Sequence, residues 1–173
     1  FDDTETWDKL LNQLTTGEMT RIVTGSALSP IPSIAYPAMF MKDGPQGNQL
    51  RTYVEDGTSA TGFCGEVLRA CSFNRDLMYE VGTAMGEDWY RTETVGAYTP
   101  AVNIHRTPYA GRNFEYYSED GFLSGELATQ EVEGLQNHGV ICYIKHFALN
   151  DQETNRQGIC TFSNEQAIRE IYL

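Results

Sequence analysis

The chain has 173 residues, of which 40% are hydrophobic and 21% charged, so it is long enough to bury a core and is neither disordered nor fibrous. Its 24 acidic and 12 basic residues give a net charge of -12, which argues against a nucleic-acid-binding surface and against attraction to an anionic membrane. No apolar run approaches the roughly 20 residues that a membrane-spanning helix needs. We therefore expect a globular domain without nucleic-acid or membrane partners.

The first 35 residues are expected to form a helical lead-in to this domain. Apolar residues at helical spacing predict a helix over residues 4–14, with Asp3 among the capping candidates, and residues 17–23 predict a second, shorter helix. Residues 29–37 contain three prolines and predict an extended connector.

Short apolar runs at residues 38–41, 95–102 and 140–144 predict strands. The last run is rich in β-branched residues and follows a glycine, which is typical of a buried parallel strand. The run at residues 38–41 leads into a polar cluster that begins at Lys42, so we expect Asp43 to lie just beyond the strand.

Helical patterns lie between and after these strands. Asn74 is a capping candidate for a helix whose core-facing residues recur every four positions: Leu77, Val81, Met85 and Trp89. Ser118 or Asp120 can cap a further helix that ends at Gly139. Ser163 and Gln166 have the spacing of a capping box for a last helix.

Alternation of strands and helices predicts an α/β fold with a parallel sheet covered by helices. We treat residues 1–173 as a single domain. Because the last helical pattern is still running at Leu173, we expect this chain to be a fragment of a larger domain.

The cysteines Cys64, Cys71, Cys142 and Cys160 lack the close paired spacing of a zinc site, and four of them in a chain of this length do not make a disulfide framework. We expect mostly buried thiols, no metal site and no cofactor. The chain begins at Phe1 without a Met, so an upstream segment can be missing; we expect a cytoplasmic location, with secretion left open.

Polar clusters follow each of the three expected strands. They pair Asp43 with Arg51, Arg112 with Glu115, and Lys145 with His146 and Arg156. The carboxyl ends of parallel neighbours meet on one rim, so these clusters are expected to gather there. Carboxylates accept bidentate hydrogen bonds from vicinal hydroxyls and cations donate to others, which suits a neutral, hydroxyl-rich ligand. The nearby aromatics are expected to stack on a sugar face: Tyr109, Phe114 and Tyr116.

Three segments in chain order carry a resemblance to a known family. They are Asp43-Gly44-Pro45, the run GRNFEYYSED from Gly111 to Asp120, and the run KHFALNDQETNR from Lys145 to Arg156. Together with Asn103-Ile104-His105-Arg106, they resemble the signatures of glycoside hydrolase family three, the β-glucosidase and β-xylosidase type. The resemblance covers most of residues 36–173 and implies the N-terminal part of a (β/α)8 TIM-like barrel.

The resemblance also implies which residues bind sugar at the cleaved end: Asp43, Arg51, Arg112, Lys145, His146 and Arg156. Asp43 is expected to hold the hydroxyls farthest from the scissile bond, with Lys145 and His146 on their neighbours. Consecutive strand residues point to opposite faces, yet both Lys145 and His146 should reach the ligand. The resemblance implies that a non-proline cis peptide beside His146 resolves this, and we expect one here. Two departures from the family pattern are two additional residues between Asp43 and Arg51, and Gly121 where proline is usual.

The catalytic pair is not expected within this chain. Retaining glycosidases use a nucleophile and an acid/base carboxyl, and the resemblance places the nucleophilic Asp and the acid/base Glu beyond Leu173. The implied activity is hydrolysis of terminal non-reducing β-D-glucosyl or xylosyl residues with retention, by the longer protein, with this chain alone inactive. The alternative is a non-catalytic carbohydrate-binding or degenerate relative.

The implied partners are a β-glucoside or β-xyloside oligosaccharide, the remainder of the barrel and a C-terminal domain, with a homo-oligomer left open. For two acids we favour structural roles: Glu115 in an ion pair with Arg112, and Glu153 orienting Arg156. Asp120 is a helix-capping group rather than a catalytic acid. The chain has no glycine-rich phosphate-binding pattern, which argues against a nucleotide-binding domain.

Overall fold

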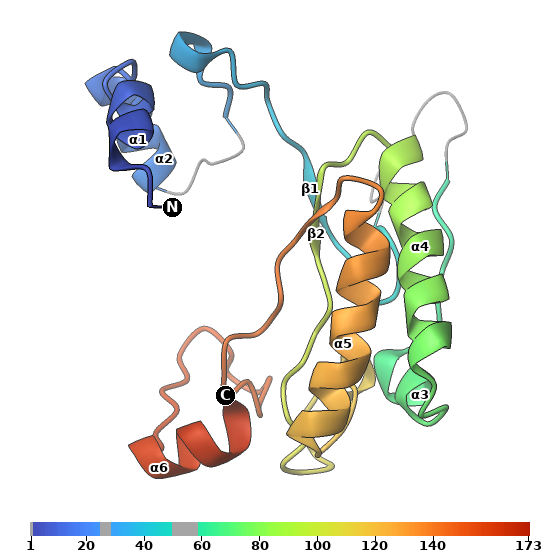
Figure 1. Cartoon of the computed structure of the whole chain (residues 1–173). Helices are drawn as coiled ribbons and strands as arrows, with labels where there is room; N and C mark the ends of the chain where they lie inside the picture. The colour runs from blue at the N-terminus through green and yellow to red at the C-terminus, as the bar shows by residue number, and fades with distance from the viewer. Residues whose placement is uncertain (1, 25–28, 50–58) are drawn as a thin grey trace. The chain divides into compact units, whose positions relative to one another are not determined.

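A computed structural model describes residues 2–24, 29–49 and 59–173 of the chain (Figure 1). Arg51, one of the expected sugar-binding residues, lies outside these described residues. The chain divides into two compact units, Phe1–Met41 and Lys42–Leu173. Each unit is described by itself.

The first unit contains the helices α1 (Thr4–Leu11) and α2 (Thr16–Val23), so both predicted helices are confirmed. Asp3 caps α1 by accepting a hydrogen bond from the Thr6 amide at 3.0 Å. Helix α1 ends at Leu11, earlier than expected, because the chain turns there toward the capping box that starts α2. In that box Glu18 is buried and also accepts a hydrogen bond from the Ser33 hydroxyl at 2.7 Å.

The predicted connector at residues 29–37 is not fully extended. It contains a single 3-10 turn, η1 (Pro32–Ile34), with a proline in its first turn. Ile31 and Tyr36 on either side form an antiparallel bridge. Proline suits this position because its missing N–H would have no partner in the first turn of a helix.

The three strands are β1 (Met41–Asp43), β2 (Gly96–Tyr98) and β3 (Ile141–Cys142), and they form one sheet in that order. Strands β2 and β3 are parallel, as predicted, with Gly96 opposite Ile141. A further parallel bridge joins Ala101 to Lys145. The first strand lies later than expected, because Asp43 ends the strand instead of following it.

The predicted buried strand at residues 140–144 is only partly buried. Val140 is buried, whereas Ile144 is 59% exposed. Strand β3 is last in the order of the sheet, so among the described residues no strand pairs with its outer edge.

Helices α3 (Glu66–Ala70), α4 (Arg75–Arg91) and α5 (Gly121–Gln136) belong to the second unit. Asn74 caps α4 and Asp120, not Ser118, caps α5, since each side chain accepts a hydrogen bond from the amide three residues later. Helix α4 lies alongside α5, as Figure 1 shows. The first turn of α5 therefore forms on an aspartate cap although Gly121 replaces proline.

One part of the predicted core-facing stripe of α4 is wrong. Met85 and Trp89 are fully buried, but Leu77 is 38% exposed and Met78 is buried in its place. A Cβ atom added to Gly82 would lie only 2.3 Å from the Glu131 carbonyl oxygen of α5. The close approach of the two helices at Gly82 sets the rotation of α4 and brings Met78 into the interface.

The core consists of two groups of buried hydrophobic residues. Their members are Ala70, Met78, Tyr117, Leu127 and Ala128 in one group, and Met85, Trp89, Ala97, Leu135 and Val140 in the other. The Trp89 indole N–H donates to the Gly96 carbonyl at 3.1 Å, which ties α4 to β2.

The expectation of buried thiols is wrong for most of the cysteines. Cys64, Cys71 and Cys160 are exposed and Cys142 is partly buried. The exposed three lie before α3, at its end and in the segment after Arg156, all outside the contact between helices and sheet.

The last helical segment comprises α6 (Glu165–Ala167) and the π-helical turn η3 (Ile168–Tyr172). Its cap is Asn164 rather than Ser163, because the Asn164 side chain accepts a hydrogen bond from the Ala167 amide at 2.8 Å. Across the part of the chain that the structure describes, no helix is long and apolar enough to cross a membrane.

Candidate functional site

The site starts from an ion pair between two residues that are far apart in the sequence. The Lys145 ammonium nitrogen lies 2.5 Å from Oδ1 of Asp43. Strand β1 carries Asp43 at its end, and the parallel bridge with Ala101 places Lys145. The Lys145 side chain is 13% exposed, whereas Asp43 is 41% exposed, so the carboxylate remains accessible to a ligand.

Four more charged side chains continue from this pair, so that six alternate in sign. Lys145 also lies 3.3 Å from Glu115, and Glu115 forms an ion pair with Arg112. A second carboxylate, Glu153, then contacts Arg112 at 3.7 Å and Arg156 at 3.4 Å. The predicted ion pairs of Glu115 with Arg112 and of Glu153 with Arg156 are therefore confirmed. Among the described residues, three acids and three bases balance, so the cluster fits a neutral ligand better than a charged one.

His146 adjoins this cluster, and its ring is held from one side. The Tyr116 hydroxyl lies 3.0 Å from Nδ1 of His146, and the Asn150 side-chain nitrogen lies 2.7 Å from the same hydroxyl and 3.3 Å from Nδ1. Burial raises the pKa of Tyr116 to about 12, so its hydroxyl stays protonated at neutral pH. Since Asn150 and Tyr116 both present donors, Nδ1 of His146 is the acceptor and Nε2 carries the proton.

The charge state of His146 follows from its surroundings. Burial, and then the positive charges of Arg112 and Lys145, lower the pKa of His146 below its usual 6.5. The ring is therefore neutral at neutral pH. It offers one N–H donor to a ligand without adding a charge.

The backbone at this site is also specific. The peptide bond between Lys145 and His146 is cis, which confirms the expected non-proline cis peptide. When the side-chain nitrogen of Asn103 faces the His146 carbonyl, it donates to that carbonyl at 3.3 Å. The side-chain oxygen of Asn103 then accepts from the backbone N–H of Asn150 at 2.8 Å. The buried Asn103 side chain thus connects the segment after β2 to the loop after β3.

A pocket of about 320 Å³ lies against these residues. It is lined by residues that offer charges, amides and hydroxyls together with a few apolar contacts: Arg112, His146, Ala148, Leu149, Asn150, Gln152, Glu153, Arg156, Ile159 and Thr161. The expected residues Arg112, His146 and Arg156 therefore meet at one pocket. The Arg156 side chain is 64% exposed, so it lies at the open side.

The expectation that Tyr116 stacks on a sugar face is wrong. Its ring is buried and its hydroxyl holds His146, so it positions another side chain instead. Phe114 and Tyr109 are 49% and 92% exposed and remain available for stacking. Sequence reasoning also missed Asn150; its only local signal was a position four residues after His146.

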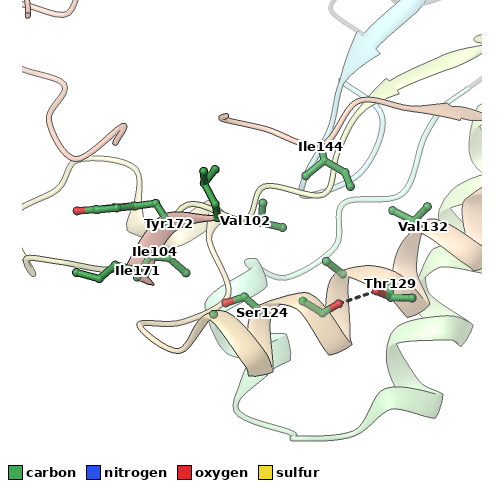
Figure 2. Close-up of a pocket in the computed structure, with 12 residues that line it drawn as sticks. Val102, Ile104, Ser124, Thr129, Val132, Ile144, Ile171 and Tyr172 are labelled. Carbon is green, nitrogen blue, oxygen red and sulfur yellow. Dashed lines mark hydrogen bonds between the residues drawn. The ribbon is translucent and has the colours of Figure 1, made fainter. Parts of the chain in front are cut away.

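A second pocket, of about 380 Å³, has a different character (Figure 2). It lies between α5 and the last turn of the chain, and Val102, Ile144 and Ile171 are among the side chains that line it. Its hydroxyl groups already have partners within the protein: Thr129 donates to the Gly125 carbonyl at 2.8 Å. A hydroxyl-rich ligand would find few hydrogen-bond partners there.

No group of three or more His, Cys, Asp or Glu side chains within residues 2–24, 29–49 and 59–173 is arranged to hold a metal ion. The acids of the site instead form ion pairs with Lys145, Arg112 and Arg156.

Comparison with known proteins gives a consistent result. The family model described as "Glycosyl hydrolase family 3 N terminal domain" matches residues 12–173. The chain is 48% identical over 143 residues to beta-glucosidase A of Butyrivibrio fibrisolvens, covering 83% of the chain and 17% of that protein. It is 38% identical over 175 residues to thermostable beta-glucosidase B of Acetivibrio thermocellus, covering 95% of the chain and 23% of that protein.

Solved structures extend the comparison to the fold. Beta-glucosidase 3B from Thermotoga neapolitana, in complex with glycerol, superposes with a TM-score of 0.85 at 41% identity over 95% of this chain and 26% of its own. The same enzyme with α-D-glucose gives a TM-score of 0.78 at 46% identity, covering 83% of this chain and 21% of its own. The expected fold, the N-terminal part of a TIM-like (β/α) barrel, is confirmed. The chain spans about a fifth of the length of the curated relatives it matches.

Proposed function

The chain belongs to glycosyl hydrolase family 3, and on that premise we propose that it supplies the sugar-holding part of a β-glucosidase site. The sugar is the non-reducing terminal glucosyl unit of a β-glucoside. Asp43, Lys145, His146 and Arg112 bind its hydroxyls, and Arg156 closes the open side of the pocket. Arg51 is proposed as a further sugar ligand on the family resemblance alone.

The observation that carries this proposal is the contact of Asp43 with Lys145 beside a neutral His146. An accessible carboxylate accepts hydrogen bonds from two vicinal hydroxyls. Lys145 and the Nε2–H of His146 are donors for the oxygens of the same hydroxyls or of their neighbours. Balanced charges favour a neutral sugar over an acidic one, and beta-glucosidases are the relatives that match this chain.

The reaction we propose is hydrolysis of the β-glucosidic bond with retention. It needs a nucleophilic carboxylate and an acid/base carboxyl roughly 5 to 5.5 Å apart. The acids of this site, Asp43, Glu115 and Glu153, are each in ion pairs with cations, which suits binding better than proton transfer. We therefore assign the catalytic pair to parts of the protein outside residues 1–173. No cofactor is required by this chemistry.

The test uses the protein as its source produces it. We expect release of nitrophenol from an aryl β-D-glucoside, and a rise in KM together with a fall in kcat in Asp43→Asn. A matched control is Asp2→Asn, an exposed aspartate in the other unit, which leaves both constants unchanged. Faster hydrolysis of an aryl β-D-xyloside would redirect the proposal to xylosides.

The alternative function is sugar binding without hydrolysis. It predicts that the natural protein binds glucose in calorimetry but releases no nitrophenol from either aryl glycoside. An intact mass of the natural protein near 19.4 kDa would also favour this alternative, because the chain alone has that mass. The cytoplasmic location and the homo-oligomer stay predictions, to be tested by fractionation and by light scattering.

A further inference from the structure

A buried network of charged side chains lies beneath the candidate site. Glu66 and Glu131 have no exposed surface and Arg69 is 3% exposed. Arg69 contacts Glu131 at 2.6 Å and Glu66 at 3.4 Å. Removing ionised groups from water is costly unless their partners are well placed. The sugar site as described so far does not use these residues.

Arg69 holds the segment that follows Asp43. Its second terminal nitrogen, Nη2, donates to the carbonyl oxygen of Pro45, two residues after Asp43. The intervening Gly44 packs closely against Trp89, because a Cβ atom added there would lie 2.3 Å from the Trp89 ring. Arg69 therefore fixes the backbone that follows the end of β1.

Glu66 binds the backbone at Ala101, the residue that forms a parallel bridge with Lys145. Both of its carboxylate oxygens accept from the Ala101 amide, at 3.1 and 3.2 Å. On either side of Ala101, the Pro100 carbonyl accepts from the Lys145 amide at 3.1 Å and the Val102 amide donates to the Lys145 carbonyl at 2.6 Å. The backbone of Lys145 is thus positioned by a segment anchored on Glu66.

Glu131 holds the third segment of the site. It accepts hydrogen bonds from the Tyr117 hydroxyl at 2.5 Å and from the Thr99 hydroxyl at 3.0 Å. The neighbouring Tyr116 carries the hydroxyl that binds His146. One buried network therefore reaches all three segments that carry the sugar-binding side chains.

We propose that Arg69, together with Glu66 and Glu131, is a positioning group of the sugar site that sets the spacing between Asp43 and the Lys145–His146 pair. The inference rests on the proposed function, because it concerns how the same site is held. Arg69 is suited to this role because a planar guanidinium donates in several fixed directions, which a lysine does not. Here its donors reach the Pro45 carbonyl and the Glu131 carboxylate, and Glu66 lies 3.4 Å from Nη2.

The network contains two carboxyl groups and one guanidinium. Burial, and then the charge of Glu131, raise the pKa of Glu66 well above its usual range. This direction favours the protonated form of Glu66, and the nearby charge of Arg69 opposes it. Glu66→Gln keeps a side-chain oxygen that accepts from the Ala101 amide.

The experiment measures KM for an aryl β-glucoside, the inhibition constant of glucose, and Tm, in the protein as its source produces it. Arg69→Met is expected to raise both constants about tenfold or more, since displacements on the order of 1 Å at a binding site have large effects. The triple variant Glu66→Gln, Arg69→Met, Glu131→Gln leaves no charge buried, so it avoids misfolding from an unpaired acid. It is expected to show the same rise.

Leu135→Ala is the matched control, because it opens a cavity among Met85, Trp89, Ala97 and Val140 while all three charged side chains of the network and their hydrogen-bond partners stay in place. It is expected to lower Tm and leave KM unchanged, as a purely structural role would. Wild-type KM in the folded triple variant overturns the inference. Failure of the unmodified protein to hydrolyse or bind any glucoside overturns the proposed function itself, and this is seen before any variant is made.

Discussion

The Tyr116 hydroxyl lies 3.0 Å from Nδ1 of His146, although the two residues are 30 positions apart. This contact makes a buried tyrosine the orienting partner of a ligand-facing imidazole. With Nδ1 occupied, the ring can only present Nε2–H to the pocket.

Tyr116→Phe removes this hydroxyl and keeps the ring in its buried position. We expect glucose to bind about five- to tenfold more weakly, the effect of losing one hydrogen bond worth about 1 kcal/mol. Isothermal titration with glucose measures the change. Tyr109→Phe is the matched control, because Tyr109 is 92% exposed and should show unchanged affinity. Equal losses in the two variants would contradict the role of Tyr116.

The lowered pKa of His146 predicts a pH dependence of stability and binding. Below its usual value of 6.5, the unfolded chain takes up a proton at this residue while the folded protein does not. The neutral His146 ring therefore contributes fully to the stability of the folded protein above pH 6.5. This contribution is lost as the pH falls from 6.5 through the lower pKa that His146 has in the folded protein. NMR titration of the His146 ring in the folded protein should give a midpoint below 6.5. The histidines of the urea-unfolded chain are the reference. A midpoint at or above 6.5 in the folded protein would refute the lowered pKa of His146.

The Asp43–Lys145 ion pair should be measurable in a double-mutant cycle with Asp43→Asn and Lys145→Met. Because Asp43 is 41% exposed, solvent weakens the attraction, and we expect a coupling free energy of about 1 kcal/mol in urea unfolding. The pair of Glu5 and Lys9, with side chains 80% and 70% exposed, is the control and should give about 0.3 to 0.5 kcal/mol. A coupling no larger than that of the control would mean that the partly buried Lys145 gains no stabilisation from Asp43.

Two glycines of α5 should respond in opposite directions to alanine. A Cβ atom at Gly134 would lie 2.5 Å from the Thr83 amide nitrogen and 2.6 Å from the Tyr79 carbonyl oxygen of α4, so Gly134→Ala should lower the free energy of unfolding by about 1 to 3 kcal/mol. Gly125 has nothing within 4 Å of such an atom, so Gly125→Ala should raise it by about 0.5 to 1 kcal/mol. Chemical denaturation measures both, and a stabilised Gly134→Ala would contradict the close packing of α4 on α5.

Much of the secondary structure could be predicted because it depends on neighbours in the sequence. The caps at Asn74 and Asp120 and the length of α4 follow from hydrogen bonds and periodicity within a few residues. Periodicity did not give the rotation of α4, since the choice of Met78 over Leu77 depends on where the backbone of α5 approaches Gly82. The same limit applies to the strand at residues 140–144, whose exposure depends on its place in the sheet.

The sequence by itself determined the polar residue types of the site and, through three motifs in order, the family. Only the tertiary structure decided how those residues pair: the alternating charges from Asp43 to Arg156, the burial of Tyr116, and the network of Glu66, Arg69 and Glu131. The physical reason is distance along the chain. Lys145 and Asp43 are 102 positions apart, and local propensity carries no information about which charges meet across such a separation.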